Sequence, residues 1–535
     1  MKTTKKIMLT GMACCFCVSE LFAGGLLTNT NQSVHFLRNP ARNASTEIDA
    51  VYTNPAGLAK LSEEGWHFSL NNQSAFQTRT ITSTFGNSVA GIYPFTGFGG
   101  NDTKSFEGKA SAPFIPSLLG AYKTGDWVFS GSISVVGGGG TLTFDKGLPS
   151  FEAPISMIPI QLQANSVPTD RYDVDVFMEG SSLILGGQLG ATYSINDMFS
   201  VYAGFRMNMV SNGYVGHLRD ISISPTHPAL NPTGELMLAS TFFNNAKQAA
   251  QGASASLQPA ISGGAGEYTL AQMVAVGLMD QSQVDQLAGG LGLSPEAAGA
   301  LKVIEAQGAF DQAAATYEQS ANMTADKNLD CSQSSWGITP MIGFNFTWNR
   351  LNVGVKYEFQ TSMNLKNKTK VDDTGLFPDG EETPNDLPAI LTIGAQYDII
   401  PCVTVSASWN HFFDSDAKMA NDKQKYINGG INDYMLGAEW RINKRFLVSA
   451  GGIFTRTGVT DDYQADMNFF LNSNSFCFGG AVNVSESVRI NLGCLFTNYE
   501  DWTKKTDNYN GTGMPGTDVF SRTNKAFGIG VDFRF

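Results

Sequence analysis

The sequence has little charge and, after its first residues, no long apolar run. Charged residues make up 16% of its 535 residues, whereas roughly a quarter is usual in soluble domains. The mean hydropathy is −0.10, and no stretch past the N-terminus approaches the ~20 apolar residues of a membrane-spanning helix. These absences exclude a polytopic helical membrane protein, while the hydrophobic content of 42% excludes a disordered chain.

Basic residues and histidines are also scarce. The 35 Lys and Arg against 48 Asp and Glu give a net charge of −13, which argues against nucleic acid as a partner because phosphate binding needs clustered Lys and Arg. None of the five histidines has the HExxH spacing, and no G-x-S-x-G elbow precedes a helix. His411 with Asp414 or Asp416 is an imaginable catalytic pair, but a solvated histidine is the simpler interpretation. The sequence predicts neither an enzyme nor a metal or other cofactor.

The N-terminal residues 1–23 have the composition of a secretory signal peptide. Lysines begin it, an apolar stretch runs from residue 7 to 18, and Leu21-Phe22-Ala23 provides a small-residue cleavage site. A lipoprotein attached through Cys14 or Cys15 is the alternative, although the residues before them form a poor lipobox. The chain is therefore predicted to be exported.

Cysteine offers no recognisable metal site. Three of the seven cysteines lie in the predicted signal peptide, and the others are far apart in sequence: Cys331, Cys402, Cys477 and Cys494. Metal ligands usually occur at close spacings. We interpret these residues as buried or lipid-facing, and an oxidising compartment would permit one disulfide among them.

What the sequence has in abundance is glycine, with 57 residues, and strict period-2 alternation. The last segment shows the alternation best, because an apolar residue occupies every second position and small or charged residues lie between them. That apolar face consists of Phe527, Ile529, Val531, Phe533 and Phe535. A soluble sandwich also alternates, so the lengths of segments and connections must decide between the two classes.

Fourteen such segments can be counted, many of them close to the ~10 residues of a tilted membrane strand. They are 65–77, 116–124, 127–136, 182–195, 198–210, 335–348, 351–363, 388–399, 402–412, 432–442, 445–456, 474–484, 487–498 and 523–535. Six tight turns, such as Gly125-Asp126 and Asn349-Arg350, alternate with seven long connections. This alternation predicts an all-β fold, a 14-stranded antiparallel transmembrane β-barrel, spanning residues 65–535 in the bacterial outer membrane.

Two regions do not fit the barrel wall. Residues 24–64 are too polar and irregular to form a strand, and they predict an N-terminal hatch (plug) that starts at the periplasmic rim. Within residues 225–330, the composition becomes rich in Ala, Gln and Met, and Ser294 followed by Pro295 is a helix start signal. This pattern predicts an extracellular helical insert, either a cap packed on itself or a landing site for apolar ligands.

Four basic residues are expected to face the lumen. One interpretation is a structural ladder with Glu358, Glu439 and Asp532; the other is that one cation binds a ligand carboxylate by charge-assisted hydrogen bonds. The four candidates are Arg206, Lys356, Arg441 and Arg489.

One motif resembles a known family. The segment Thr53-Asn54-Pro55-Ala56-Gly57-Leu58 precedes the first predicted strand. It resembles the FadL/OmpP1/TodX outer-membrane transporters, as do residues 42–50 before it and residues 112–117, which lead into the segment 122–126. Asn54, Pro55 and Ala56 are the candidate hatch motif. The tripeptide alone is a weak signal, but with the predicted signal peptide, the strand count and the terminal Phe535 it becomes specific.

The resemblance implies that hydrophobic compounds, long-chain fatty acids among them, bind above the hatch and leave through a lateral opening at a kink in the third strand. The run Gly137-Gly138-Gly139-Gly140 follows the predicted third strand. It marks either that kink or the start of a flexible loop, since glycine permits both. Expected partners are hydrophobic small molecules, outer-membrane lipid and lipopolysaccharide.

Two alternative functions stay open at this stage. The barrel can anchor the helical insert as a surface-binding or adhesion protein, or it can be an open diffusion pore. The sequence does not specify the substrate, the residues that contact it or the oligomeric state.

Overall fold

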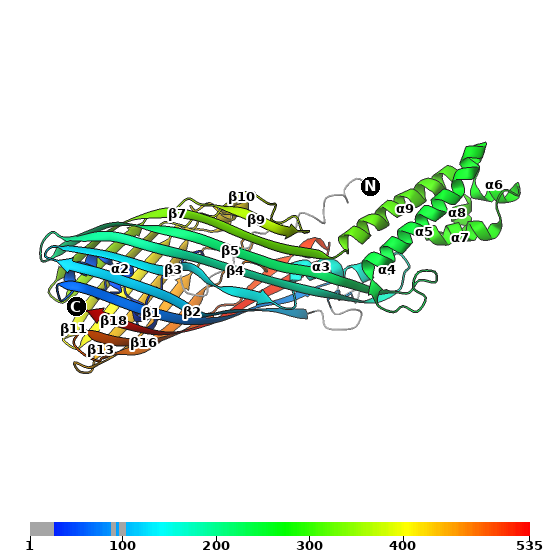
Figure 1. Ribbon diagram of the computed structural model, residues 1–535. Coiled ribbons are helices and arrows are strands. Elements are labelled where there is room, and N and C mark those ends of the chain that lie inside the picture. The colour runs from blue at the N-terminus through cyan, green and yellow to red at the C-terminus, as the bar shows by residue number, and fades with distance from the viewer. Residues whose placement is uncertain (1–25, 87–91, 96–102) are drawn as a thin grey trace.

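A computed structural model describes residues 26–86, 92–95 and 103–535 of the chain. The predicted signal peptide and the first two residues of the predicted hatch lie outside the described residues. Figure 1 shows a long barrel with a helical extension at one end. Labels below follow this figure.

Fourteen antiparallel strands form a closed wall, which confirms the predicted fold class. Pairing of the first strand with the last along nearly its whole length closes the barrel. The wall strands are β1 (Gly65–Phe85), β2 (Thr103–Thr124), β3 (Trp127–Phe144), β4 (Thr169–Ser194), β5 (Phe199–Pro225), β7 (Lys327–Trp348), β8 (Leu351–Glu358), β11 (Ile390–Ile400), β12 (Val403–Phe412), β13 (Ile431–Arg441), β14 (Phe446–Arg456), β15 (Ser473–Asn483), β16 (Val488–Tyr499) and β18 (Gly516–Arg534). Short turns join them at one end and long loops at the other, as predicted.

Several strands extend beyond their predicted limits at the long-loop end. β5, for example, has 27 residues, and the outward side chains of upper β2 include exposed Thr103, Ser105 and Glu107. In these strand extensions the outward residues are mostly polar, not apolar. The pattern of a membrane strand, which needs an apolar outer face, therefore does not predict them. Short strands complete this collar: β6 (Met237–Leu238), β9 (Asn364–Asp372), β10 (Glu382–Pro384) and β17 (Trp502–Thr506).

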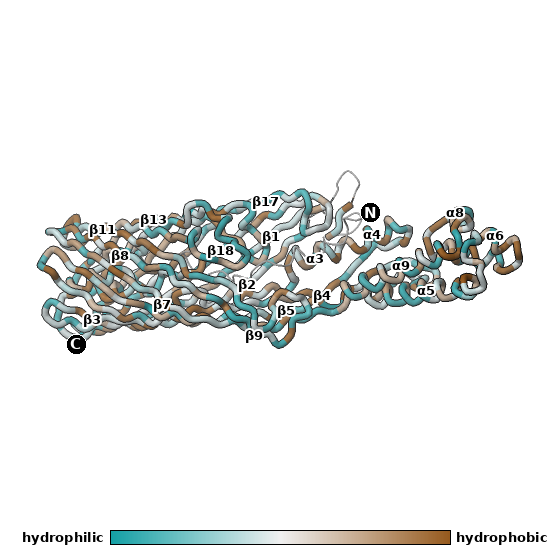
Figure 2. The backbone as a smooth tube through the Cα atoms, turned by 90° about the horizontal axis from the view of Figure 1, so that it is seen from above, coloured by the Kyte–Doolittle hydropathy of each residue, from teal (hydrophilic) through white to brown (hydrophobic). Residues whose placement is uncertain are grey.

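A band around the outer face of the wall carries exposed apolar side chains. Phe476, Leu436 and Ile529 expose 68%, 59% and 52% of their surface, whereas the alternate residues point inward and are small, polar or charged. Figure 2 shows this mixture of hydrophobic and hydrophilic colours along the barrel strands. A closed barrel with an apolar outer face satisfies its backbone hydrogen bonds in lipid, and the chain is therefore a multi-pass outer-membrane barrel. Among the described residues, no helix combines the length and apolar character needed to cross a bilayer.

Helices cover the long-loop end and project from it. α3 (Pro149–Ser156) and α4 (Ile158–Ala164) follow β3, and the 3₁₀ segments are η3 (Ala420–Tyr426) and η4 (Tyr509–Gly511). The helical insert contains α5 (Ala239–Ala260), a π-helical η2 (Ile261–Ala265), α6 (Leu270–Ala275), α7 (Gln281–Leu291), α8 (Pro295–Gly299) and α9 (Val303–Met323). α5 and α9 lie side by side as a stalk, and Ser294 caps α8 by accepting the Ala297 N–H at 3.2 Å.

The N-terminal segment, residues 26–64, lies inside the barrel. It contains α1 (Val34–Arg38), α2 (Ala50–Thr53) and the 3₁₀ helix η1 (Pro55–Lys60), and nearly every residue from 26 to 61 is buried. Leu26 N–H donates to Asp414 beyond β12, while the Lys60 ammonium donates to the Asp197 carbonyl in a short turn. The segment therefore runs from deep in the lumen down to the periplasmic end, and the expected start at the periplasmic rim is wrong.

Candidate functional site

Charged side chains fix the N-terminal segment to the wall in the periplasmic half of the lumen. Arg42 bridges Asp49 (2.7 Å), Glu47 (2.8 Å) and Glu439 (3.3 Å), and Arg489 reaches Glu47 at 2.6 Å. The network also includes an Arg38–Glu439 pair and a His35 Nε2–Asp532 Oδ2 contact of 3.1 Å. We call these residues the lumenal ion network.

The arginines stabilise the ionised form of two acids in this network, Glu47 and Asp49. Burial by itself raises the pKa of Glu47, but the guanidinium groups of Arg489, Arg42 and Arg38 outweigh it and lower the pKa well below its usual range. Burial likewise raises the pKa of Asp49, and Arg42 lowers it further than burial raises it. The carboxylates therefore remain charged and bound at every pH near neutrality.

The same carboxylates include the group best placed among the described residues to hold a metal. Ligand atoms of His35, Glu47 and Asp49 lie within 4.8 Å of one another. However, the Arg42 guanidinium donates to both acids at 2.7–2.8 Å. The Arg42 guanidinium thus already supplies the positive charge that a metal ion would bring. The arrangement is therefore an ion-pair network and not a metal site.

A second buried cluster contains two of the predicted lumen cations. Arg206 and Lys356 both bind Glu358, and Lys356 also donates to the Tyr52 carbonyl at 2.6 Å. The Tyr52 ring lies 4.6 Å from the ammonium, within cation–π distance. Tyr52 Oη then donates to the Asn29 carbonyl at 3.1 Å. We call this the Tyr52 cluster.

The four predicted cations are not brought together at one site. Arg206 and Lys356 belong to the Tyr52 cluster and Arg489 to the lumenal ion network, whereas the half-exposed Arg441 pairs with Asp398 at 3.2 Å near a periplasmic turn. Each has a carboxylate partner within the protein. The acids expected in the ladder are used differently: Glu358 binds two of these cations, and Glu439 binds arginines of the N-terminal segment.

The Asn54-Pro55-Ala56 motif anchors the lower end of the N-terminal segment. Asn54 Nδ2 donates to Asn345 Oδ1 at 2.8 Å, and the carbonyls of Pro55 and Ala56 accept hydroxyls of wall residues at 2.7 Å. Proline starts η1, where its fixed φ suits the first helical residue. Ala56 is fully buried against the wall, so a larger side chain there would push the N-terminal segment away from the wall.

The glycine run forms a kink within β3. Gly138 and Gly139 adopt φ of +63° and +109°, conformations that other residues rarely take. Pairing between β2 and β3 stops at Ser117–Ser134 and resumes only at Ser111–Thr141. We call the stretches that do not pair with each other, 112–116 of β2 and 135–140 of β3, the pairing gap. The strand continues to Phe144, so the flexible-loop interpretation of the glycine run is wrong.

The start of the N-terminal segment occupies the pairing gap. Asn29 donates through its backbone N–H to the Val136 carbonyl (2.7 Å) and through Nδ2 to the Gly138 carbonyl (3.0 Å). Gln32 Nε2 donates to the Val135 carbonyl at 3.0 Å, and Ser117 Oγ donates to the Gln32 carbonyl at 2.6 Å. We call residues 27–32 the gap-filling segment, because they bond backbone carbonyls of β3 that have no partner on β2 within the gap.

Apolar side chains fill the extracellular half of the lumen beside this segment. One cluster consists of Leu26, Leu27, Tyr52, Val136, Ile184, Val210, Met363, Leu365, Leu387, Ile390, Phe412, Met419, Ile427, Ile431, Val459, Tyr463 and Phe470. A second cluster includes Ile115 and Val135 at the gap and extends to Phe469 and Phe520. The pairing gap therefore lies between the lumenal apolar clusters and the membrane face of the barrel.

Two buried arginines next to these clusters escaped the sequence analysis. Arg79 and Arg522 are direct cross-strand partners on β1 and β18, and they expose only 1% and 5% of their surface. Their guanidinium groups lie over the rings of Phe469 and Tyr499 at 5.4 and 4.8 Å. Both positions fall outside the predicted strands. The alternation of Gln77, Arg79 and Ile81 continues that of the first predicted strand and was a usable signal that this strand extends past residue 77.

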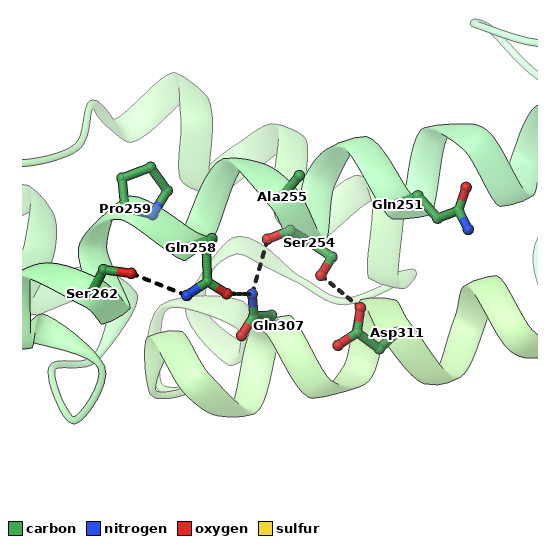
Figure 3. Close-up of a pocket in the computed structure, with 8 residues that line it drawn as sticks. All are labelled: Gln251, Ser254, Ala255, Gln258, Pro259, Ser262, Gln307 and Asp311. Carbon is green, nitrogen blue, oxygen red and sulfur yellow. Dashed lines mark hydrogen bonds between the residues drawn. The ribbon is translucent and has the colours of Figure 1, made fainter.

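An open polar groove of about 730 Å³ lies on the stalk of the helical insert. Figure 3 shows its residues on α5, η2 and α9: Gln251, Ser254, Ala255, Gln258, Pro259, Ser262, Gln307 and Asp311. Most polar groups pair with one another, for example Ser254 Oγ with Asp311 at 2.6 Å and Gln307 Nε2 with Gln258 Oε1 at 2.9 Å. These bonds join the two helices, and the groove is therefore a helix contact rather than a ligand site.

His411 does not form the imagined catalytic pair. Its Nδ1 lies 2.9 Å from Asn432 Oδ1, whereas Asp414 accepts the Leu26 N–H from the N-terminal segment.

Comparison with known proteins gives similarity of fold. No protein-family model matches the sequence, and no curated protein matches it. The structure is similar to a Pseudomonas aeruginosa FadL homologue, with a TM-score of 0.54 and 11% identity, covering 96% of this chain and 100% of that chain. The Pseudomonas putida toluene transporter TodX gives a TM-score of 0.49 and 13% identity, with 97% and 100% covered.

Proposed function

Because the chain has the fold of a FadL homologue, we propose that it carries hydrophobic compounds across the outer membrane. The observation that carries this proposal is the position of the gap-filling segment, which lies in an interruption of the barrel wall beside two lumenal apolar clusters. Ligand enters from the extracellular side and displaces apolar side chains. It then leaves sideways when residues 27–32 move.

A lateral route suits apolar cargo physically. Transfer of such a compound into water costs ~25 cal/mol per Å² of apolar surface, so a water-filled pore helps it little. A route from an apolar lumen into the lipid avoids that transfer. The N-terminal segment then acts as the hatch, because the lumenal ion network and Asn54-Pro55-Ala56 hold its lower part while its first residues are released.

We further propose long-chain fatty acids as the substrate class. Arg79 and Arg522 place two cations beside Phe469 and Phe520 in the apolar lumen. A fatty acid has the same combination of a long apolar chain and one carboxylate, which arginine binds by charge-assisted hydrogen bonds.

A reversible disulfide tests the route. Gln32→Cys/Ser117→Cys joins residues whose carbonyl and hydroxyl lie 2.6 Å apart and fixes the gap-filling segment to β2. We expect uptake of radiolabelled oleate, in cells without another fatty-acid transporter, to stop under oxidation and to return with reductant. The matched control is Thr82→Cys/Ser105→Cys, which joins directly paired residues of β1 and β2 away from the gap.

Two results would contradict the transport proposal, and a third would contradict the carboxylate site alone. Undiminished oleate uptake by the oxidised Gln32→Cys/Ser117→Cys protein rules out exit past residues 27–32. A large steady ion current in planar bilayers identifies an open pore. If oleate uptake and toluene transport are both unchanged in Arg79→Ala/Arg522→Ala, the carboxylate site is ruled out but the apolar route is left intact.

A further inference from the structure

The far end of the helical insert carries an exposed apolar loop. Residues 274–279 read Val-Ala-Val-Gly-Leu-Met, without one polar side chain, and form the last turn of α6 and the loop that follows it. Val276 and Leu278 expose 56% and 63% of their surface. Consecutive exposed apolar residues reduce solubility, and such a patch usually marks a binding surface.

The loop has a defined conformation. Gly277 adopts φ +74°, a left-handed conformation that suits glycine. Backbone hydrogen bonds of 3.0 Å join Val276 N–H to Gln272 and Leu278 N–H to Met273. Met273 is itself buried in the core of the insert. The apolar side chains are therefore presented on a formed turn, so a partner binds without having to order it.

The loop lies far from the proposed transport route. Figure 1 places α6, α7 and α8 at the end of the stalk opposite the barrel, and Figure 2 shows hydrophobic colours around α6 and α8 there. The 22 residues of α5 correspond to a length of about 33 Å at 1.5 Å per residue. The exposed apolar surface thus lies outside the lumen and away from the pairing gap.

The charge of the surroundings restricts what can cover this loop. No Lys or Arg occurs between Lys247 and Lys302, whereas Glu267, Asp280, Asp285 and Glu296 fall in that stretch. Lys302 is engaged by Glu267 at 2.6 Å. An anionic lipid surface or a second copy of the same acidic tip would bring like charges together, which is unfavourable.

We propose that the tip of the insert, residues 266–302, is a docking surface for a basic amphipathic polypeptide segment. Apolar side chains of the partner cover Val276 and Leu278, and its Lys and Arg residues meet the surrounding carboxylates. This division into an apolar centre and a charged rim is typical of protein interfaces. The stalk holds this surface above the barrel, where an extracellular polypeptide can reach it.

The test uses the full chain in nanodiscs of phosphatidylcholine and a fluorescein-labelled amphipathic peptide of leucine and lysine. Fluorescence anisotropy should show saturable binding, weakened at least about tenfold by Val276→Asp/Leu278→Asp, because the apolar centre carries most of the energy. Asp280→Asn/Asp285→Asn should weaken it about threefold and reduce its salt dependence. Leu236→Asp, which changes another exposed leucine outside the tip, is the matched control and should bind as wild type.

Helical circular dichroism and the heat-dependent gel mobility of the barrel show that each variant is folded. Equal peptide binding by wild type and the Val276→Asp/Leu278→Asp variant, or an equal loss in Leu236→Asp, overturns the proposal. Tip-dependent binding to phosphatidylglycerol vesicles overturns it in favour of a lipid surface. Tip-dependent self-association in sedimentation velocity overturns it in favour of a second copy.

Discussion

The two halves of the lumen differ in their balance of polar and apolar contacts. In the periplasmic half, the N-terminal segment is held by the lumenal ion network and by hydrogen bonds from its Asn-Pro-Ala motif. In the extracellular half, apolar side chains pack on one another. Directional polar contacts specify one geometry, whereas apolar contacts can be exchanged for those of another apolar body of similar volume. The lower half is therefore suited to hold the hatch and the upper half to admit a ligand.

Breaking the polar half should have the largest effect. Arg42→Ala leaves the fully buried Asp49 without its cation, and loss of one partner from a buried ion pair typically costs about 3–5 kcal/mol. We expect release of the N-terminal segment, measured as new sites of limited proteolysis within residues 26–64 and as increased ion conductance. The control Lys425→Ala removes an exposed pair with Asp422 and should change stability by less than about 1 kcal/mol. Unchanged proteolysis in Arg42→Ala would contradict the structural role of the network.

Cavities made in the two halves of the lumen should differ in whether an added apolar ligand restores stability. Phe412→Ala removes a fully buried ring from the apolar half, at a cost of about 3 kcal/mol in unfolding free energy. Added dodecane should restore much of this loss because the cavity lies where ligand is proposed to bind. Leu58→Ala makes a comparable cavity in the periplasmic half and should not be rescued. If dodecane rescues both variants equally in denaturant titrations, the extracellular half is not the only half that admits an apolar ligand.

The boundary between the halves can be tested at the pairing gap. A Cβ at Gly137 would lie 2.3 Å from the Leu27 carbonyl oxygen, so Gly137→Ala should displace residues 27–32 at a cost of about 1–3 kcal/mol. Faster hydrogen exchange of the Asn29 amide is the expected readout. At Gly187 an added Cβ meets nothing within 4 Å, and Gly187→Ala should therefore exchange as wild type. Slow exchange at Asn29 in both variants would show that the gap tolerates the methyl group.

Sequence reasoning found the wall because lipid on one side and the lumen on the other impose a period-2 pattern that needs no knowledge of neighbours. It also identified the glycine run, since backbone conformation at Gly138 and Gly139 is a local property. It did not find the partners of the lumen cations. Arg38 and Glu439 are separated by 401 positions, and only closure of the barrel decides which charges meet.

The smallest expected effect is the pH dependence at the top of the N-terminal segment. Burial, with a contribution from the nearby Asp433, raises the pKa of Asp414 to about 7, against ~3.9 in an unfolded chain. The folded protein thus binds more protons than the unfolded one between these values, and its stability falls as pH rises from 4 to 7. Denaturant midpoints should fall less steeply between pH 4 and 7 in Asp414→Asn than in wild type, while the exposed Asp416→Asn keeps the wild-type slope. An unaltered slope in Asp414→Asn would mean that another group controls the pH dependence at the top of the N-terminal segment, where Asp414 accepts the Leu26 N–H.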